Sequence, residues 1–240
     1  MTITTITTQA ELDAAVATDP DRWHVVGDTV SEWLSVRDGT RVTAFGDSRI
    51  RVHAGSRVMA HDGSRVAAYR DSQVSAHGDS RVMAYAGSQV AAYRDSQVTA
   101  YKNAQVDAYN GSHVRARSGS RVCAAAGSEV TAYDGSRVSA HRGSRVSAHG
   151  DSRVSAHEGS QVSAHDGAQV TAYDGSQVSA YDGSLVRAYE GSQVMAYVGS
   201  KVDAYDGSQV RAYAGSQVRV HEGSHVVAAV DAELMRLERS

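Results

Sequence analysis

Residues 38–229 form a tandem repeat with a strict period of eight residues. Within each repeat, small constant residues alternate with variable, mostly polar residues. The valine of the motif G-S-x-V-x-A recurs at Val42, Ile50 and Val58 and then at every eighth residue to Val226, which gives 24 units without an insertion or a deletion. Within a unit, Ser, Val and Ala alternate with variable residues, which is the period of two of a β-strand. The pattern therefore predicts one short strand and one turn per unit, with Ser, Val and Ala facing inward.

The residue before the conserved serine predicts the turn. Glycine occupies this place in most units, because it adopts a left-handed backbone without strain. The other occupants are Asp and Asn, which tolerate that conformation best among the remaining residues or form side-chain turns. They are Asp47, Asp71, Asp79, Asp95, Asn103 and Asp151.

An array of this kind has to stack, because one slip would break every ladder between neighbouring units. Eight residues are too few to close a coil around a core, whereas 16 residues close a flattened two-sided coil and 24 would close a triangular one. We favour 16 residues per coil. The sequence thus predicts an all-β protein, a parallel β-solenoid of about 12 two-sided coils with a thin core and with handedness left open.

The segments at either side of the array are expected to be small caps, since an open solenoid exposes strand edges. Residues 1–37 are expected to form an N-terminal cap. It contains a helix over Gln9–Ala17 that starts at the capping-box pair Thr8 and Glu11 and ends before Pro20.

Two irregular strands are expected to complete the N-terminal cap, over Trp23–Val26 and Val30–Val36. Residues 230–240 are expected to form the C-terminal cap. The segment Asp231–Glu238, with Leu234, predicts a short amphipathic closing helix. The alternative is that one of the two ends is a dimerisation surface.

Composition narrows the classes of protein. The chain has 22 Gly, one Pro and one Cys among 240 residues, and a formal net charge of −3. The near-neutral charge disfavours nucleic acid and anionic membranes as partners. Cys123 stands alone, which excludes an intrachain disulfide. Neither a secretory signal nor a long apolar run is present, so we expect a cytoplasmic protein and leave export by another route open.

The repeat resembles that of bacterial ice-nucleation proteins, A-G-Y-G-S-T-x-T, which pairs into 16-residue coils of a β-solenoid. The matching stretch is Gly175-Ser176-Gln177-Val178-Ser179-Ala180. It is also similar to tandem S-x-V-x-A-Y octapeptide arrays of uncharacterised actinobacterial and phage proteins. The first resemblance implies a solenoid and a surface that orders water or binds ice.

The match to T-x-T is incomplete at the outward positions. The first Thr is replaced by Gln, Arg or another residue in every unit. The second is Ser or Thr in part of the array, at Ser139, Ser147, Ser155, Ser163, Thr171 and Ser179.

Aromatic residues recur at one repeat position, three residues after the inward valine. All 12 tyrosines occupy it, and histidine takes their place in several units. With two units per coil, residues 16 apart would stack in columns, either as packing or as a sticky stripe for a partner, a carbohydrate or a second copy. The candidate columns are Tyr173, Tyr181, Tyr189, Tyr197, Tyr205, Tyr213, His141, His149, His157 and His165.

The histidine block has two further interpretations. Stacked imidazoles could hold a transition metal or repel one another once protonated near pH 6. No carboxylate or cysteine stands at ligand spacing, so we expect packing by neutral histidine and no metal or other cofactor.

Arginine recurs after the serine and predicts either a solvated, screened row or an anion-binding groove. The candidate row is Arg41, Arg49, Arg57, Arg65, Arg137, Arg145 and Arg153.

No motif predicts catalysis. Ser, His and Asp recur as columns instead of forming one singular triad, and phosphate-binding glycine loops are absent from the sequence. We therefore expect a non-enzymatic scaffold or interaction rod, with self-association through aromatic columns or end surfaces. Ice or ordered-water binding is the alternative, and binding of nucleic acid or another polyanion through the arginine rows is the second alternative.

Overall fold

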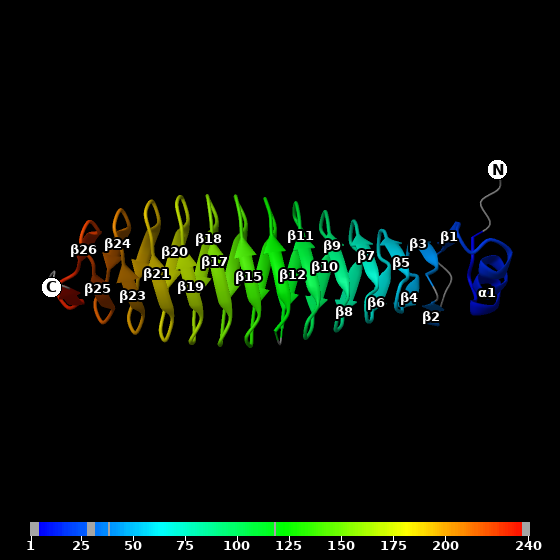
Figure 1. The fold of residues 1–240 in the computed structure, drawn as a ribbon, viewed down its shortest axis with the longest axis horizontal. Helices are drawn as coiled ribbons and strands as arrows, with labels where there is room; N and C mark the ends of the chain where they lie inside the picture. The colour runs from blue at the N-terminus through cyan, green and yellow to red at the C-terminus, as the bar shows by residue number, and fades with distance from the viewer. Residues whose placement is uncertain (1–4, 28–31, 38, 118, 237–240) are drawn as a thin grey trace. The chain divides into compact units, whose positions relative to one another are not determined.

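The computed structural model describes residues 5–27, 32–37, 39–117 and 119–236. In these residues the chain forms one helix and 27 short strands, which make two parallel sheets of 14 and 13 strands (Figure 1). The predicted all-β, two-sided parallel solenoid is confirmed. The ladders join residues 16 apart, which excludes the 24-residue coil.

The helix and the odd-numbered strands have the following bounds: α1 (Gln9–Thr18), β1 (Trp23–Val26), β3 (Arg41–Ala44), β5 (Arg57–Ala60), β7 (Gln73–Ala76), β9 (Gln89–Ala92), β11 (Gln105–Ala108), β13 (Arg121–Ala124), β15 (Arg137–Ala140), β17 (Arg153–Ala156), β19 (Gln169–Ala172), β21 (Leu185–Ala188), β23 (Lys201–Ala204), β25 (Gln217–Val220) and β27 (Glu233–Arg236). The even-numbered strands are β2 (Leu34–Val36), β4 (Arg49–Val52), β6 (Arg65–Ala68), β8 (Arg81–Ala84), β10 (Gln97–Ala100), β12 (His113–Ala116), β14 (Glu129–Ala132), β16 (Arg145–Ala148), β18 (Gln161–Ala164), β20 (Gln177–Ala180), β22 (Gln193–Ala196), β24 (Gln209–Ala212) and β26 (His225–Ala228).

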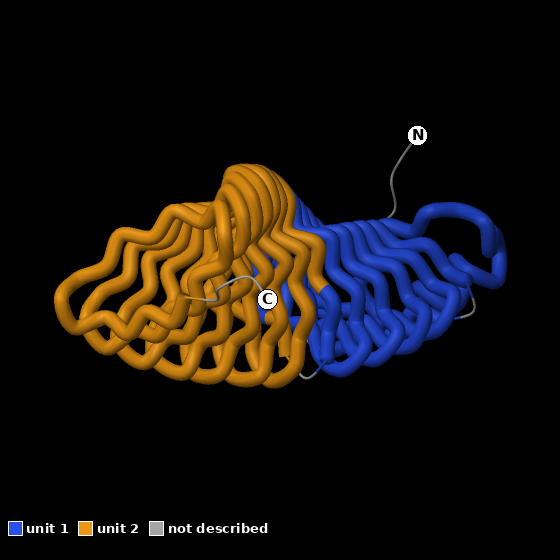
Figure 2. Tube along the Cα trace, turned by 60° about the vertical axis from the view of Figure 1, so that its left-hand side comes forward, with its two compact units in different colours: residues 1–115, 119–121 blue, residues 116–118, 122–240 orange. Residues whose placement is uncertain are grey.

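The chain divides into two compact units, drawn in blue and orange in Figure 2. Unit 1 comprises residues 1–115 and 119–121, and unit 2 comprises residues 116–118 and 122–240. Within each unit the odd-numbered strands pair with odd-numbered strands and the even-numbered with even-numbered ones, so each coil contributes one strand to each sheet. Both units therefore show the same construction, a strand, a turn, a strand in the second sheet and a turn back.

The core consists of the three inward residues of each repeat. In one octapeptide repeat, for example, Ser176, Val178 and Ala180 are buried, whereas Gln177 is exposed and Ser179 is half-buried. This alternation recurs along nearly all strands of both units, as the sequence predicts. Because the inward residues are small, the two strands of a coil enclose a thin layer of side chains.

The turns carry their own ladder of hydrogen bonds. Gly175 has a φ of +68°, and its amide donates to the carbonyl of Gly191 one coil further on, at 3.1 Å. The Ser176 amide closes the turn by donating to the Tyr173 carbonyl at 3.0 Å. The Ser176 hydroxyl donates to the same carbonyl at 2.5 Å. In other turns, such as those of Ser144 and Ser160, the buried serine hydroxyl has no hydrogen-bond partner among the described residues.

The sequence places the left-handed residue wrongly in three turns. Asp71, Asp95 and Asn103 adopt positive φ, as predicted. In the Gly-Asp turns, however, the glycine one place earlier is the left-handed residue, for example Gly150 with a φ of +55° before Asp151. Glycine has no Cβ to strain in this region, so where Gly and Asp are adjacent the turn shifts to put glycine there.

The N-terminal segment of unit 1 follows the prediction closely. α1 begins at the Thr8 and Glu11 capping box and extends one residue beyond the predicted Ala17. Three bonds from Thr7 and Thr8 to the Glu11 carboxylate lower its pKa, of which the Thr7 amide has the largest effect. Leu12 on α1 is buried, and β1 forms where predicted. Of the strand predicted over Val30–Val36, β2 covers Leu34–Val36, and residues 30 and 31 lie outside the described residues.

The helix predicted over Asp231–Glu238 is wrong within the described residues. Glu233–Arg236 form strand β27, which pairs with β25 and places Leu234 beside Val218. Hydrogen bonds of Glu233 explain why this segment forms a strand. The Glu233 amide donates to the Ser216 carbonyl at 2.9 Å, and the side-chain amide of Gln217 donates to the Glu233 carboxylate at 3.0 Å. With β1 and β2 before the array and β27 after it, the solenoid has about 13 coils, slightly more than the predicted 12.

Among the described residues, no helix is long and apolar enough to cross a membrane.

Candidate functional site: the outward columns

The first and third residues of each strand face outward, and the ladders align them with residues 16 positions away. Each sheet of each unit therefore displays parallel columns of side chains, one residue per coil, at the strand spacing of about 4.8 Å. The aromatic residue that follows each strand adds one more column per sheet. These columns are the part of the molecule that differs from coil to coil, and so they are the candidate site.

The odd-numbered strands of unit 2 carry one of the predicted aromatic columns. Its rings stack nearly parallel, with centroid distances of 5.0 Å for His141–His157, 4.7 Å for His157–Tyr173 and 5.6 Å for Tyr173–Tyr189. Tyr205 continues the column at 4.8 Å from Tyr189.

The even-numbered strands of unit 2 carry the second predicted column. His149 stacks on His165 at 4.9 Å, His165 on Tyr181 at 4.5 Å, and Tyr181 on Tyr197 at 4.8 Å. Tyr213 follows at 4.8 Å from Tyr197. Each inner ring is therefore covered on both faces by its neighbours, which leaves ring edges for any partner.

Unit 1 has the same two columns with more mixed membership. Stacked pairs with centroids 4.9–5.5 Å apart run from Phe45 to Tyr109 on one side and from His53 to Tyr101 on the other. Stacked aromatic pairs contribute roughly 0.5–1.5 kcal/mol beyond the area they bury. The columns thus stabilise the coils whether or not anything binds to them.

The interruption of the aromatic pattern in unit 2 is partly filled by a cation. Arg117 replaces a ring, and its guanidinium lies 5.8 Å from the centroid of the Tyr133 ring. A guanidinium over a ring face is a cation–π contact, so Arg117 continues the stacked column with a cation in place of a ring. Ala125 and Ala229 occupy the same repeat position and have no ring to contribute.

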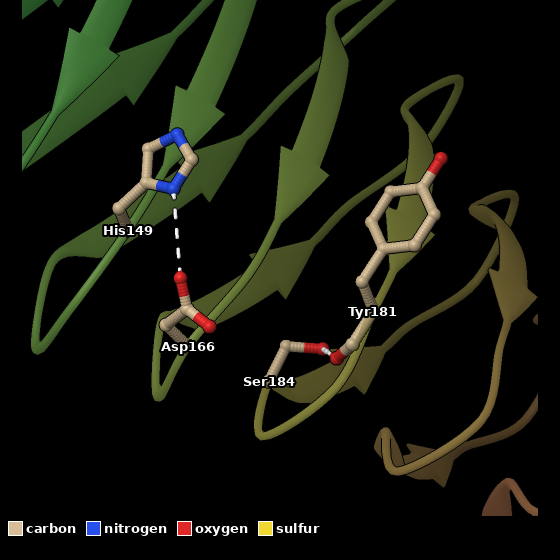
Figure 3. Close-up of polar contacts among 4 residues, drawn as sticks. All are labelled: His149, Asp166, Tyr181 and Ser184. Atoms are coloured by element: carbon tan, nitrogen blue, oxygen red, sulfur yellow. Dashed lines mark hydrogen bonds and ion pairs between the residues drawn. The ribbon is translucent and has the colours of Figure 1, made fainter.

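His157 and His165 are held toward the neutral form. Partial burial and the neighbouring His141 lower the pKa of His157. Burial and His149 likewise lower the pKa of His165, while the carboxylate of Asp166 acts in the opposite direction. The Asp166 carboxylate lies 4.0 Å from Nδ1 of His149 (Figure 3). Two adjacent imidazoles in one column therefore oppose double protonation.

The phenol of Tyr197 is also held toward its neutral form. Burial raises the pKa of Tyr197, and the adjacent Tyr181 and Tyr213 raise it further, because each would repel a second phenolate. The Tyr197 hydroxyl contacts the sulfur of Met195 at 3.6 Å, so this ring lies beside the outward side chain of its own strand.

The arginine row of the sequence separates into columns on different sheets. In unit 1 Arg41 lies opposite Arg57, and Arg49 lies opposite Arg65. Arg41 also donates to the Asp21 carbonyl at 3.1 Å, which ties it to the N-terminal segment.

In unit 2 the same row is shorter and partly neutralised. Arg137 lies opposite Arg153, whereas Arg145 lies on the other sheet and forms an ion pair with Glu129 at 3.5 Å. The structure therefore does not bring all seven predicted arginines into one groove.

Among the described residues, no group of three or more His, Cys, Asp or Glu is arranged to hold a metal ion. Cys123 is exposed and not in a disulfide. The repeated inward serines are buried and form part of the core.

Sequence reasoning missed an apolar surface on the last strands of unit 2. Val227 is 64% exposed, Met235 is 60% exposed and Val230 is fully exposed, and Leu234 is exposed as well. The signal was in the sequence, because Leu234 stands eight residues after Val226 and so continues the register of inward valines. We name the residues 225–236 of β26, β27 and the turn between them the apolar edge.

Comparison with known proteins adds little to this picture. No protein-family description matches the chain, and no curated protein matches it. Among solved structures, the chain is similar to the crystal structure of the TibC-catalysed hyper-glycosylated TibA55-350 fragment, with 14% sequence identity, a TM-score of 0.43, and coverage of 90% of this chain and 88% of that one. A likeness at this TM-score carries no argument about function.

Proposed function

We propose that this protein is a non-enzymatic interaction scaffold that associates with a second copy of itself through the apolar edge. The observation that carries the proposal is the exposure of Val227, Val230 and Met235 on β26, β27 and the turn between them, in a molecule whose inward valines and alanines are otherwise almost all buried. Val198, Leu185 and Met195 are also exposed, but at outward or turn positions.

The solenoid suits a scaffold because its backbone is fixed while its outward residues vary. Each coil is joined to the next by strand ladders and by turn ladders such as Gly175 to Gly191. A lattice of this kind holds every column at a constant spacing, so a surface can be varied without changing its geometry.

The apolar edge is a better candidate for self-association than the aromatic columns. The inner tyrosine rings already cover each other, so binding to their edges would bury little apolar area. On the apolar edge, β27 has a partner strand on one side only among the described residues, and its second side can accept another strand.

Light scattering coupled to size exclusion tests the proposal. The 240-residue chain is expected to be a dimer or larger at micromolar concentration, and the double variant Val227→Thr, Met235→Thr is expected to be a monomer. A matched control is Met59→Thr, Met83→Thr, which removes two outward methionines of unit 1 and is expected to leave the mass unchanged. A monomeric parent chain at high concentration would show the proposal to be wrong.

Ordered-water or ice binding is the second candidate, and one observation favours it. The hydroxyls of Ser147, Ser163 and Ser179 form a regular column on the even sheet of unit 2, in register with Thr131 at its start. A row of hydroxyls at strand spacing could hold a row of waters. Thermal hysteresis or a raised freezing temperature would support this candidate, and neither effect at millimolar protein would exclude it.

A further inference from the structure

Unit 1 carries a run of arginines on one face that the fold does not require. Arg49, Arg65 and Arg81 occupy the first position of β4, β6 and β8, and the ladders place Arg49 opposite Arg65 and Arg65 opposite Arg81. Arg51 adds a fourth guanidinium from the third position of β4. We name these four residues the basic face.

Such a column costs stability. Like charges directly opposite each other on neighbouring strands destabilise a sheet. The same column position in unit 2 holds Gln161, Gln177 and Gln193, on strands with the same buried valines. Glutamine therefore satisfies the fold at this position, and arginine is present for another reason.

Two other outward arginines have a carboxylate beside them. Arg145 contacts Glu129 at 3.5 Å, and Arg219 contacts Asp203 at 3.2 Å, each on the adjacent strand of its sheet. Arg65 and Arg81, in contrast, form no ion pair with any carboxylate of the described residues, although Asp62 and Asp79 stand in the preceding turns. The positive charges of Arg65 and Arg81 are thus left available to a ligand.

We propose that the basic face binds an anionic polysaccharide, a linear chain of sugars that carries sulfate, phosphate or carboxylate groups. A guanidinium bonds such groups through two parallel N–H donors, and a row of guanidiniums at strand spacing matches a polymer with repeated negative charge. Binding also removes the repulsion between Arg49, Arg65 and Arg81. This proposal is independent of self-association, because the basic face and the apolar edge lie in different units.

The rings on this face favour a polysaccharide over a single-stranded nucleic acid. Bases bind such proteins by stacking on exposed aromatic faces. The adjacent aromatic column is closed by its own stacking, with centroids 5.5 Å apart for His53–Tyr69 and 4.9 Å for Tyr69–Tyr85. Trp33, at the edge of the face, is covered by the guanidinium of Arg51 at 5.6 Å. Charge remains available here, while free ring faces are scarce.

A heparin oligosaccharide is a suitable probe. Its affinity for the full chain is measured at low salt by fluorescence anisotropy, and again for the double variant Arg65→Gln, Arg81→Gln. We expect the variant to bind at least about tenfold more weakly, since two charged contacts are lost. The matched control is Arg187→Gln, Arg211→Gln in unit 2, two arginines that have no other arginine opposite them on a neighbouring strand. It makes the same change in net charge and is expected to alter affinity by less than about threefold, because it changes only the screened overall field.

Three outcomes would overturn the proposal. The first is no heparin binding by the parent chain at low salt. The second is an equal loss of affinity in the two double variants, which would mean that net charge alone attracts the probe. The third is tighter binding of a single-stranded oligonucleotide of equal length than of heparin, which would favour nucleic acid. Circular dichroism checks that both variants fold, and the glutamines at equivalent positions of unit 2 show that the fold accepts the substitution.

Discussion

The outward faces of the even sheet in unit 1 and in unit 2 share one backbone pattern and differ in chemistry. In unit 1 a column holds Arg49, Arg65 and Arg81, and in unit 2 the equivalent column includes Gln161 and Gln177. The inward valines and alanines behind both columns are buried to the same degree. The fold therefore constrains the inward residues tightly and the outward residues hardly at all, and a difference between the two faces reports selection for something other than folding.

The largest expected loss of stability comes from a charged residue placed at an inward position of a strand. Val162 is 3% exposed and lies between Val146 and Val178 in its ladder. Val162→Asp would bury a carboxylate with no partner, at a cost of more than about 4 kcal/mol, and is expected to unfold the central coils of unit 2. Thermal denaturation followed by circular dichroism measures it. The adjacent outward change Gln161→Asp is the control, and a similar loss of stability in both would show that the two sides are not distinct.

The second largest loss of stability is expected from a substitution at a turn residue. Gly175 has a φ of +68°, and a Cβ added there would lie 3.4 Å from the Gly159 amide nitrogen. Gly175→Val is expected to destabilise unit 2 by roughly 2 kcal/mol, because a branched side chain is strained in the left-handed region. Gly175→Asn should cost less, since Asn103 takes a φ of +63° at the equivalent place in unit 1. Equal melting temperatures for the two variants would contradict this explanation.

Acid is expected to destabilise unit 2 more than unit 1. The pKa of His157 and of His165 is lowered in the fold, by burial and by the histidine beside each. Such a histidine stabilises the fold above its unfolded pKa of about 6.5, and that stability is lost as the pH falls below this value. Unit 2 has two stacked histidine pairs and unit 1 has His61–His77, in which the pKa of His77 is also lowered.

Hydrogen exchange, corrected for intrinsic rates, should therefore show more opening in unit 2 than in unit 1 at pH 5 relative to pH 7.5. The double variant His157→Tyr, His165→Tyr uses the residue that the columns hold elsewhere, and it should remove most of the difference. If that variant keeps the full acid sensitivity, the histidine columns are not its cause.

The smallest expected effect is relief of repulsion on the basic face. Arg65 has an arginine on each neighbouring strand. Arg65→Gln is expected to stabilise unit 1 by a few tenths to about 1 kcal/mol at low ionic strength, and the gain should shrink in 1 M salt, where charges are screened. Urea denaturation at the two salt concentrations measures it. A gain that does not change with salt would point to packing instead of charge.

Much of the solenoid could be predicted because every repeat has the same local pattern of inward, outward and turn residues. The period of eight, the inward Ser, Val and Ala, and the left-handed turn residue all follow from local chemistry, and so does the capping box of α1. The Gly-Asp turns show the limit of that reasoning. There the fold chose which of two adjacent residues, such as Gly150 and Asp151, takes positive φ.

The C-terminal segment shows a second limit. Its residues favour a helix in isolation, yet Glu233–Arg236 form a strand, because the free side of β25 offers a ladder of hydrogen bonds that a helix would leave unmade. The candidate site has the same dependence. The seven arginines predicted as a row are distributed over both sheets, and only the ladders decide which of them, such as Arg49 and Arg65, become neighbours.

The sequence by itself determined the strand, the turn and the inward side, because these depend on residues within one or two repeats. It also determined which residues could share a column once the coil was set at 16 residues. The tertiary structure alone decided which rings cover one another, which arginines remain without a carboxylate, and which apolar residues stay exposed. Those properties depend on contacts between strands of different coils, and a pattern read along the chain does not contain their distances.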